Sequence, residues 1–133
     1  MANPDGSIQK FIDRVLSYVA LRITSLGNKV DLSKSLQDKA WTVLKYLFVN
    51  VPELLYKRHL DQVILCAIYG AARPSEALSF VTLVEQYLAL FKVEQHMVKE
   101  VYLQGEEYTD IIGFYNRSFR VCLLYTSPSP RDS

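Results

Sequence analysis

Apolar residues recur at three- and four-residue steps along most of this chain, which is the spacing of helices with one buried face. The first such stretch predicts a helix over residues 7–26. Asp5 or Ser7 offers a side-chain oxygen to cap its start, and Gly27 with Asn28 offers a left-handed stop. The same spacing predicts a second helix over about residues 36–50.

The ends of the second helix carry their own signals. Ser35, followed three residues later by Asp38, is a weaker form of the capping box. Pro52 ends the helix or begins a short helical turn, because proline is well tolerated at a first helical position.

The third segment, residues 58–72, differs from the others because its residues 63–72 contain no charged side chain. A helix that is apolar on every side is buried on every side. We therefore expect a central helix, ended by Pro74 and surrounded by the other helices of an all-α domain. A buried strand is the alternative, but the run is longer than most strands, and Ala71 with Ala72 favours helix.

The rest of the chain alternates clear helical patterns with weaker ones. A fourth helix is expected over about residues 78–90, whereas residues 92–105 allow only a short helix. Residues 105–107 indicate a loop, with Thr109 or Asp110 as the next cap. The last helix is expected to run from Asp110 to about Val121.

Residues 122–133 break this pattern with two prolines while the last helix is in mid-course. They resemble, residue for residue, one reading frame of a transposon adapter used to build sequencing libraries. We therefore expect the domain to span residues 1–121 and this tail to be no part of it. The alternative is a phosphorylatable tail, since Ser127 and Ser129 each precede a proline.

The composition narrows the function without revealing it. The chain has 133 residues, half of them hydrophobic, which suits one globular domain. Its net charge is +1, whereas domains dedicated to nucleic acids are usually far more basic. The sequence shows neither a membrane-spanning run nor a signal peptide, and Cys66 and Cys122 form no disulfide framework or metal-ligand set. We expect no cofactor, no direct contact with nucleic acid and no contact with a membrane.

The candidate catalytic groups have simpler structural explanations. His59 and Asp61 are two residues apart, so they do not face each other on a helix, and Asp61 suits a first turn, where the dipole favours a carboxylate. Cys66 lies within the apolar run, where burial makes a thiol unreactive. The sequence contains no glycine-rich phosphate loop, serine nucleophile motif or pair of metal-binding histidines. An enzyme is therefore not expected.

Polar groups in apolar surroundings are a better indication of function. Tyr69 and Arg73 are four residues apart, on one face of the central helix, and Tyr115 with Asn116 lies in the last helix. If the two helices are adjacent, the hydroxyls and the carboxamide line a groove suited to an extended peptide backbone. The alternative is that both tyrosines are core aromatics with satisfied hydroxyls, and the pattern alone leaves both open.

Two long motifs bring in a family resemblance. The segment at residues 58–70 reads RHLDQVILCAIYG and closely resembles the signature of the B box of retinoblastoma-family pocket proteins. The segment at residues 107–116 reads EYTDIIGFYN and resembles the second signature, at a matching spacing. With similar residues in the first helix and around Trp41, the resemblance covers about residues 8–121. It implies a cyclin-like fold of about five main helices, one of them buried.

The resemblance also implies a binding site. The family's B box binds partners that carry a Leu-x-Cys-x-Glu segment, among them chromatin modifiers and viral oncoproteins. By motif position, the resemblance implies that the peptide backbone is bound by Tyr69, Tyr115 and Asn116. It implies that the pockets for the Leu and Cys side chains are formed with the help of Ile112 and Phe80. It places Arg73 near the glutamate of the segment.

The function that the resemblance implies is docking by a nuclear transcriptional corepressor that restrains cell-cycle genes. The family's A box is expected to be absent from this segment, and binding of cell-cycle transcription factors needs the complete pocket. Exposed apolar surface is expected where the A box would dock. The alternative is a cyclin-box protein that activates a kinase or serves in general transcription.

Two residues depart from the family pattern. Gly113 replaces a larger apolar residue in the second motif, which would loosen that helix by up to ~1 kcal/mol relative to alanine. Pro74 follows Arg73 directly, so the basic side chain is expected to leave the helix at an altered angle.

Overall fold

The first amphipathic stretch forms α1 (Ser7–Lys29) in the computed structural model, which describes residues 6–72 and 79–121. Of the two predicted caps, Asp5 lies outside the described residues, and Ser7 was wrong, because the N-cap is Gly6, in a left-handed conformation (φ 72°) and without a side-chain cap. The predicted stop at Gly27 was also wrong. Gly27 is buried inside the helix, where a Cβ atom would lie 2.7 Å from the Gln37 side chain, so this glycine permits a close approach of two helices.

The second helix, α2 (Lys34–Asn50), begins two residues earlier than predicted. Ser33, and not Ser35, is its cap: the Ser33 hydroxyl accepts a hydrogen bond from the Leu36 amide at 3.2 Å. The 3₁₀ turn η1 (Pro52–Leu55) follows, which confirms that Pro52 begins a short helical turn.

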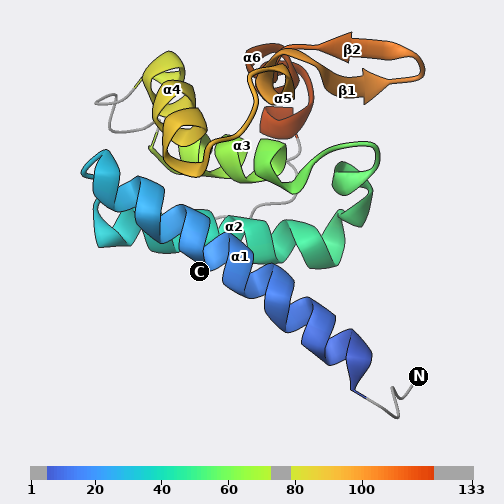
Figure 1. The fold of residues 1–133 in the computed structure, drawn as a ribbon. Helices are drawn as coiled ribbons and strands as arrows, with labels where there is room; N and C mark the ends of the chain where they lie inside the picture. The colour runs from blue at the N-terminus through green and yellow to red at the C-terminus, as the bar shows by residue number, and fades with distance from the viewer. Residues whose placement is uncertain (1–5, 73–78, 122–133) are drawn as a thin grey trace.

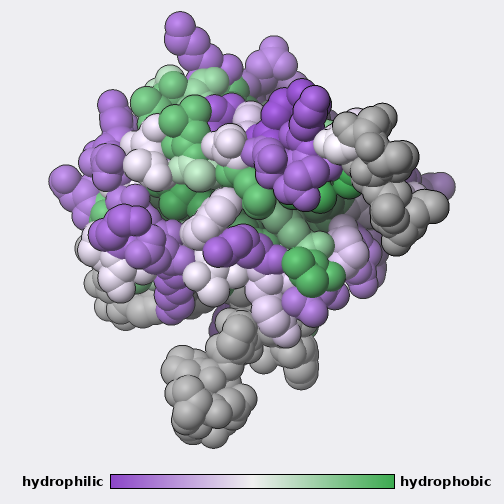
Figure 2. All heavy atoms as spheres, turned by 90° about the horizontal axis from the view of Figure 1, so that it is seen from below, coloured by the Kyte–Doolittle hydropathy of each residue, from purple (hydrophilic) through white to green (hydrophobic). Residues whose placement is uncertain are grey.

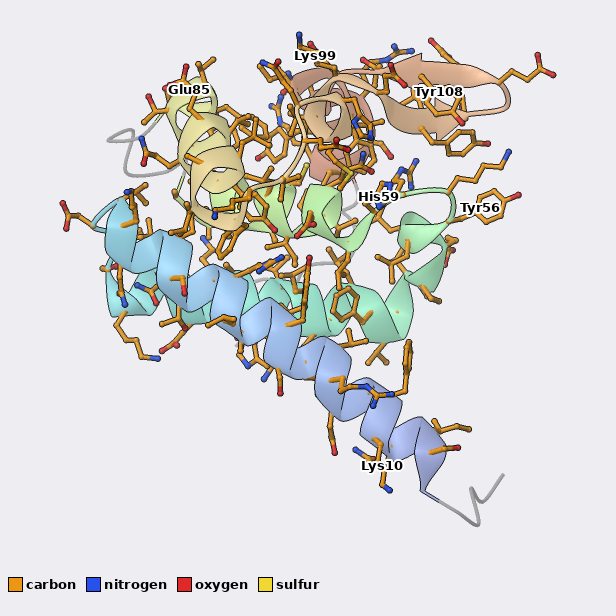
Figure 3. The ribbon with its side chains drawn as sticks, in the orientation of Figure 1. Lys10, Tyr56, His59, Glu85, Lys99 and Tyr108 are labelled. Atoms are coloured by element: carbon orange, nitrogen blue, oxygen red, sulfur yellow. The ribbon has the colours of Figure 1, made fainter. Side chains whose placement is uncertain are left out.

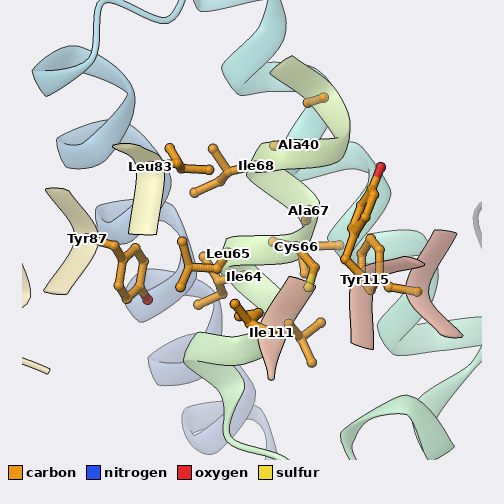
Figure 4. Close-up of a cluster of buried hydrophobic side chains, with 14 of the residues drawn as sticks. Ala40, Ile64, Leu65, Cys66, Ala67, Ile68, Leu83, Tyr87, Ile111 and Tyr115 are labelled. Carbon is orange, nitrogen blue, oxygen red and sulfur yellow. The ribbon is translucent and has the colours of Figure 1, made fainter. Parts of the chain in front are cut away.

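The uncharged run forms α3 (Leu60–Ala72), in which every residue from Gln62 to Ile68 is buried. Figure 1 shows α1 and α2 on one side of α3, and α4 with the C-terminal elements on the other. In the close-up of Figure 4, residues 64–68 of α3 lie among side chains of α4 and of the C-terminal segment. The prediction of an all-α, cyclin-like fold around a buried central helix is confirmed. Pro74, its predicted stop, lies outside the described residues.

The fourth helix, α4 (Phe80–Phe91), is capped by Ser79, whose hydroxyl accepts from the Thr82 amide at 3.1 Å. The predicted start near Leu78 lies outside the described residues. The short helix expected after it is α5 (His96–Lys99).

An antiparallel hairpin that the sequence analysis missed follows α5. Its strands are β1 (Val101–Gln104) and β2 (Glu107–Thr109). The predicted loop over residues 105–107 is right only for the turn, where Gly105 has a φ of 55°, because Glu107 already belongs to β2.

Asp110 caps the last helical segment, as predicted, by accepting from the Gly113 amide at 2.8 Å. The expected single helix is confirmed: the chain is helical without a break from Ile111 to Val121, and it includes α6 (Ile111–Phe114) and a π-helical turn, η3 (Tyr115–Phe119). Residues 122–133, including the predicted adapter-derived tail, lie outside the described residues.

Candidate functional site

Three aromatic rings that are distant in sequence meet at one point of the fold. Tyr69 comes from α3, Phe80 is the first residue of α4, and Tyr115 is the first residue of η3. The Tyr69 and Phe80 rings are stacked with centroids 4.1 Å apart, and the Tyr115 ring meets both edge-on, at 5.0 Å from Tyr69 and 5.7 Å from Phe80. Three separate helical elements are thus joined through an aromatic cluster.

The cluster is buried on its inner side and continues into exposed residues. Tyr115 and Phe80 are almost fully buried, whereas Tyr69 is half-buried. Ile112, one turn before Tyr115, is 39% exposed, and Asn116 is exposed. We call Tyr69, Phe80, Ile112, Tyr115 and Asn116 the aromatic site. Arg73, the sixth residue that the sequence analysis assigned, lies outside the described residues.

A shallow hollow adjoins the aromatic site at Ile112. It has a volume of about 240 Å³ and lies between α4, α5 and α6, with Val81, Val84 and Ile112 on its walls. Glu85, Lys99 and Asp110 also line it. The aromatic site therefore borders a partly apolar surface that carries charges of both signs.

Arg58 contacts Phe114, the residue before Tyr115, and the sequence analysis assigned it no role of its own. Its guanidinium donates hydrogen bonds to the carbonyls of Leu54 (2.8 Å), Tyr102 (2.8 Å) and Leu103 (3.1 Å). The same group lies 4.5 Å from the centroid of the Phe114 ring. One side chain thus ties η1, the hairpin and α6 together, next to Tyr115. We call this arrangement the Arg58 clamp. The one sequence signal that could have suggested it is an arginine, which stays charged at any ordinary pH, directly after a short turn.

Asp61 makes more hydrogen bonds than expected for a carboxylate that only complements the helix dipole in a first turn. Tyr18 donates to both carboxylate oxygens, at 2.8 and 2.9 Å, and Tyr87 donates to the same carboxylate. Arg22 pairs with it at 3.5 Å. Burial, followed by the hydrogen bond to Asp61, raises the pKa of Tyr18 and of Tyr87. The carboxylate is engaged by three donors, so its environment suits a structural junction and not a proton-transfer group.

The other candidate chemical groups are likewise structural. The Cys66 thiol is fully buried, and burial raises its pKa well above the usual range, as predicted. His59 is exposed, and its backbone amide donates to the Gln62 side chain. Within residues 6–72 and 79–121, no group of three or more His, Cys, Asp or Glu side chains is placed to hold a metal ion. In the same part of the chain, every helix is too short or too polar to cross a bilayer.

A family model described as the retinoblastoma-associated protein B domain matches residues 7–123. The chain belongs to this family. The match includes both motifs and every residue of the aromatic site.

Relatives of this B domain occur in plants and animals. Retinoblastoma-related protein 1 of Oryza sativa subsp. japonica is 29% identical over 126 aligned residues, covering 86% of this chain and 12% of that protein. Retinoblastoma-like protein 2 of Homo sapiens is 32% identical over 102 residues, covering 76% of this chain and 9% of that protein. The chain therefore spans about a tenth of the length of these relatives.

The B domain also exposes apolar surface on its α1 and α2 side. A hollow of about 620 Å³ lies there, and its apolar walls come from α1, α2, η1 and the first residue of α3. Phe11 is 60% exposed and Val49 is 78% exposed. Figure 2, which views the molecule from this side, shows hydrophobic residues gathered between hydrophilic ones.

Proposed function

We propose that this B domain docks partner proteins by binding a Leu-x-Cys-x-Glu segment in extended form at the aromatic site. The observation that carries the proposal is the meeting of Tyr69 and Tyr115, whose ring centroids are 5.0 Å apart although 46 positions separate the two residues in sequence. Asn116 follows Tyr115 directly on the exposed side of η3. We propose that these two phenols and the neighbouring carboxamide act together on one peptide.

These residue types suit a peptide backbone. A tyrosine hydroxyl can donate or accept, and a carboxamide can do both at once, so together they can pair with the alternating amides and carbonyls of an extended strand. Ile112 and Phe80 offer apolar contact for the Leu and Cys side chains of the segment. Because few anchors are involved, each of them is expected to contribute a large share of the affinity.

The glutamate of the segment is proposed to lie at the amino end of α4, beside Phe80. The dipole of a helix of 12 residues favours a carboxylate at this end. Arg73 is proposed to add its positive charge on the same side, on the strength of its motif position alone.

The wider role follows from family membership and remains part of the proposal. We propose a nuclear, non-enzymatic corepressor segment that tethers chromatin modifiers to cell-cycle genes and that viral oncoproteins can bind. We assign the domain to residues 1–121, leave residues 122–133 outside it, and expect cell-cycle transcription factors to bind only when an A box completes the pocket.

A labelled Leu-x-Cys-x-Glu peptide tests the site by fluorescence anisotropy. We expect saturable binding that Asn116→Ala weakens about tenfold or more, because two backbone hydrogen bonds are lost. Asn50→Ala is the matched control, since it removes an exposed carboxamide at the end of α2 and should leave the affinity unchanged. Undiminished binding by Asn116→Ala, with a folded protein, would refute the assigned site.

A further inference from the structure

Three tyrosines form a second aromatic surface that the proposed peptide site does not use. Tyr56 lies in the loop after η1, Tyr102 in β1 and Tyr108 in β2, where Tyr102 and Tyr108 are cross-strand partners. The ring centroids are 6.0 Å apart for Tyr56 and Tyr102 and 5.6 Å apart for Tyr102 and Tyr108, and both pairs meet edge to face. We call these three residues the tyrosine ladder.

The fold does not account for the exposure of the tyrosine ladder. None of its residues belongs to the hydrophobic core or packs against it, and the outer rings of Tyr56 and Tyr108 are 61% and 58% exposed. Figure 3 shows these two side chains at the same edge of the molecule, beside the hairpin. Exposed tyrosines gathered in this way are typical of binding surfaces.

The tyrosine ladder is also held in place before any ligand arrives. Arg58 binds the carbonyls of Tyr102 and Leu103 and, on its other side, that of Leu54, so the loop and the hairpin are fixed to each other. A surface that is already ordered loses little conformational entropy on binding. A hollow of about 310 Å³, lined in part by Tyr56 and Tyr102, adjoins it.

The surroundings narrow the kind of ligand. Addition of a strand to the hairpin needs a row of unpaired backbone groups, but Arg58 already occupies two carbonyls of β1, and β2 has only three residues. A cationic ligand is disfavoured because the Lys57 ammonium already lies 5.0 Å from the Tyr102 ring centroid and 5.7 Å from that of Tyr56. Recognition must therefore use the ring edges and hydroxyls, and it should favour a negative charge near Lys57.

A polyproline II helix matches these conditions. Its pyrrolidine rings are flat and apolar and can pack against the exposed outer rings of Tyr56 and Tyr108. Its carbonyls have no internal partners, so tyrosine hydroxyls can donate to them. We propose that the tyrosine ladder binds a proline-rich segment of a partner protein, with an acidic residue of that segment beside Lys57.

The test uses synthetic peptides and the complete chain. The probe is a run of prolines flanked by aspartates. Two control peptides are compared with it: the same proline run flanked by lysines, and an alanine run flanked by aspartates. In an NMR titration we expect saturable shifts of the amides of Lys57, Tyr102 and Tyr108 with the first peptide, and much weaker binding of the other two.

Variants make the test decisive. Tyr56→Ala with Tyr108→Ala removes two exposed rings and should weaken binding about tenfold or more, whereas Tyr46→Ala on α2 should not change it. Lys57→Glu should reverse the preference between aspartate and lysine flanks. Binding that survives the double variant, an unchanged flank preference, or binding of a single-stranded oligonucleotide in place of the proline peptide would overturn the proposal. Each of these results is independent of the Leu-x-Cys-x-Glu experiment.

Discussion

Gly113 shows at the scale of one residue how packing can outweigh propensity. Helix propensity alone made this glycine a weak point in the second motif. In the structure, a Cβ atom at Gly113 would overlap the hydroxyl oxygen of Thr109 and lie 3.2 Å from the Asp110 carboxylate that caps α6. The close approach of Thr109 therefore requires a glycine here, although glycine has a lower helix propensity than alanine.

We predict that Gly113→Ala lowers the free energy of unfolding by about 1–3 kcal/mol, although alanine is the better helix former. Urea denaturation followed by circular dichroism measures the change. Thr109→Ala removes the hydroxyl that the new methyl group would meet, so the cost of Gly113→Ala should shrink in that background. If Gly113→Ala alone were as stable as the parent protein, the packing argument would be contradicted.

At the scale of elements, the hairpin and the π-turn are what local patterns could not predict. The strands have four and three residues, and their burial does not alternate, so the sequence carries no strand periodicity there. They are held by contacts with distant residues, such as the hydrogen bond from Arg58 to the Tyr102 carbonyl across 44 positions. A side chain so far away in sequence leaves no local signal in the hairpin itself.

We predict that Arg58→Met loosens the hairpin selectively. Three carbonyls lose a charged donor, so stability should fall by about 1–3 kcal/mol. Amide hydrogen exchange should accelerate in β1 and β2 while α1 and α3 keep their protection. Arg117→Met is the matched control: its ion pair with Glu107, at 3.3 Å, is exposed and should contribute at most about 1 kcal/mol. Equal exchange in both variants would argue against the clamp.

At the scale of the whole molecule, one carboxylate joins three helices. Asp61 of α3 accepts hydrogen bonds from Tyr18 of α1 and Tyr87 of α4, and Arg22 of α1 pairs with it. The guanidinium of Arg22 also lies 4.2 Å from the centroid of the Phe91 ring of α4. The central helix is thus fixed to α1 and α4 through polar groups as well as through the core.

This junction predicts a pH dependence on the alkaline side. Tyr18 and Tyr87 have pKa values raised above their ordinary value of 10.0 in the folded protein. Above about pH 10 the unfolded chain therefore loses protons that the folded protein keeps, and stability falls as the pH rises. Below that pH both states hold these protons, and the contribution is constant.

Urea denaturation at increasing pH measures this slope. Tyr87→Phe should reduce the decline above pH 10 by up to ~1.4 kcal/mol per pH unit, the contribution of one titrating group. Tyr18→Phe combined with Tyr87→Phe should flatten it further. Identical slopes in the parent protein and in Tyr87→Phe would show that burial and the hydrogen bond to Asp61 do not raise the pKa of Tyr87.

The sequence by itself determined the helices and the buried centre of this protein. Periodic apolar residues and caps such as Asp110 act within one or two turns, so they can be read locally, and the uncharged run over residues 63–72 could only be buried. The two motifs also identified the family. Helix ends were less accurate, because Gly27 serves the close approach of α2 and not a helix end, and because Ser33 caps α2 in place of the equally plausible Ser35.

Only the tertiary structure decided what lies beside what. The meeting of Tyr69, Phe80 and Tyr115, the junction at Asp61 and the clamp of Arg58 each join segments that are far apart in the chain. Such contacts depend on how whole helices pack, and packing follows from the fit of many side chains at once. No spacing within a single segment encodes them.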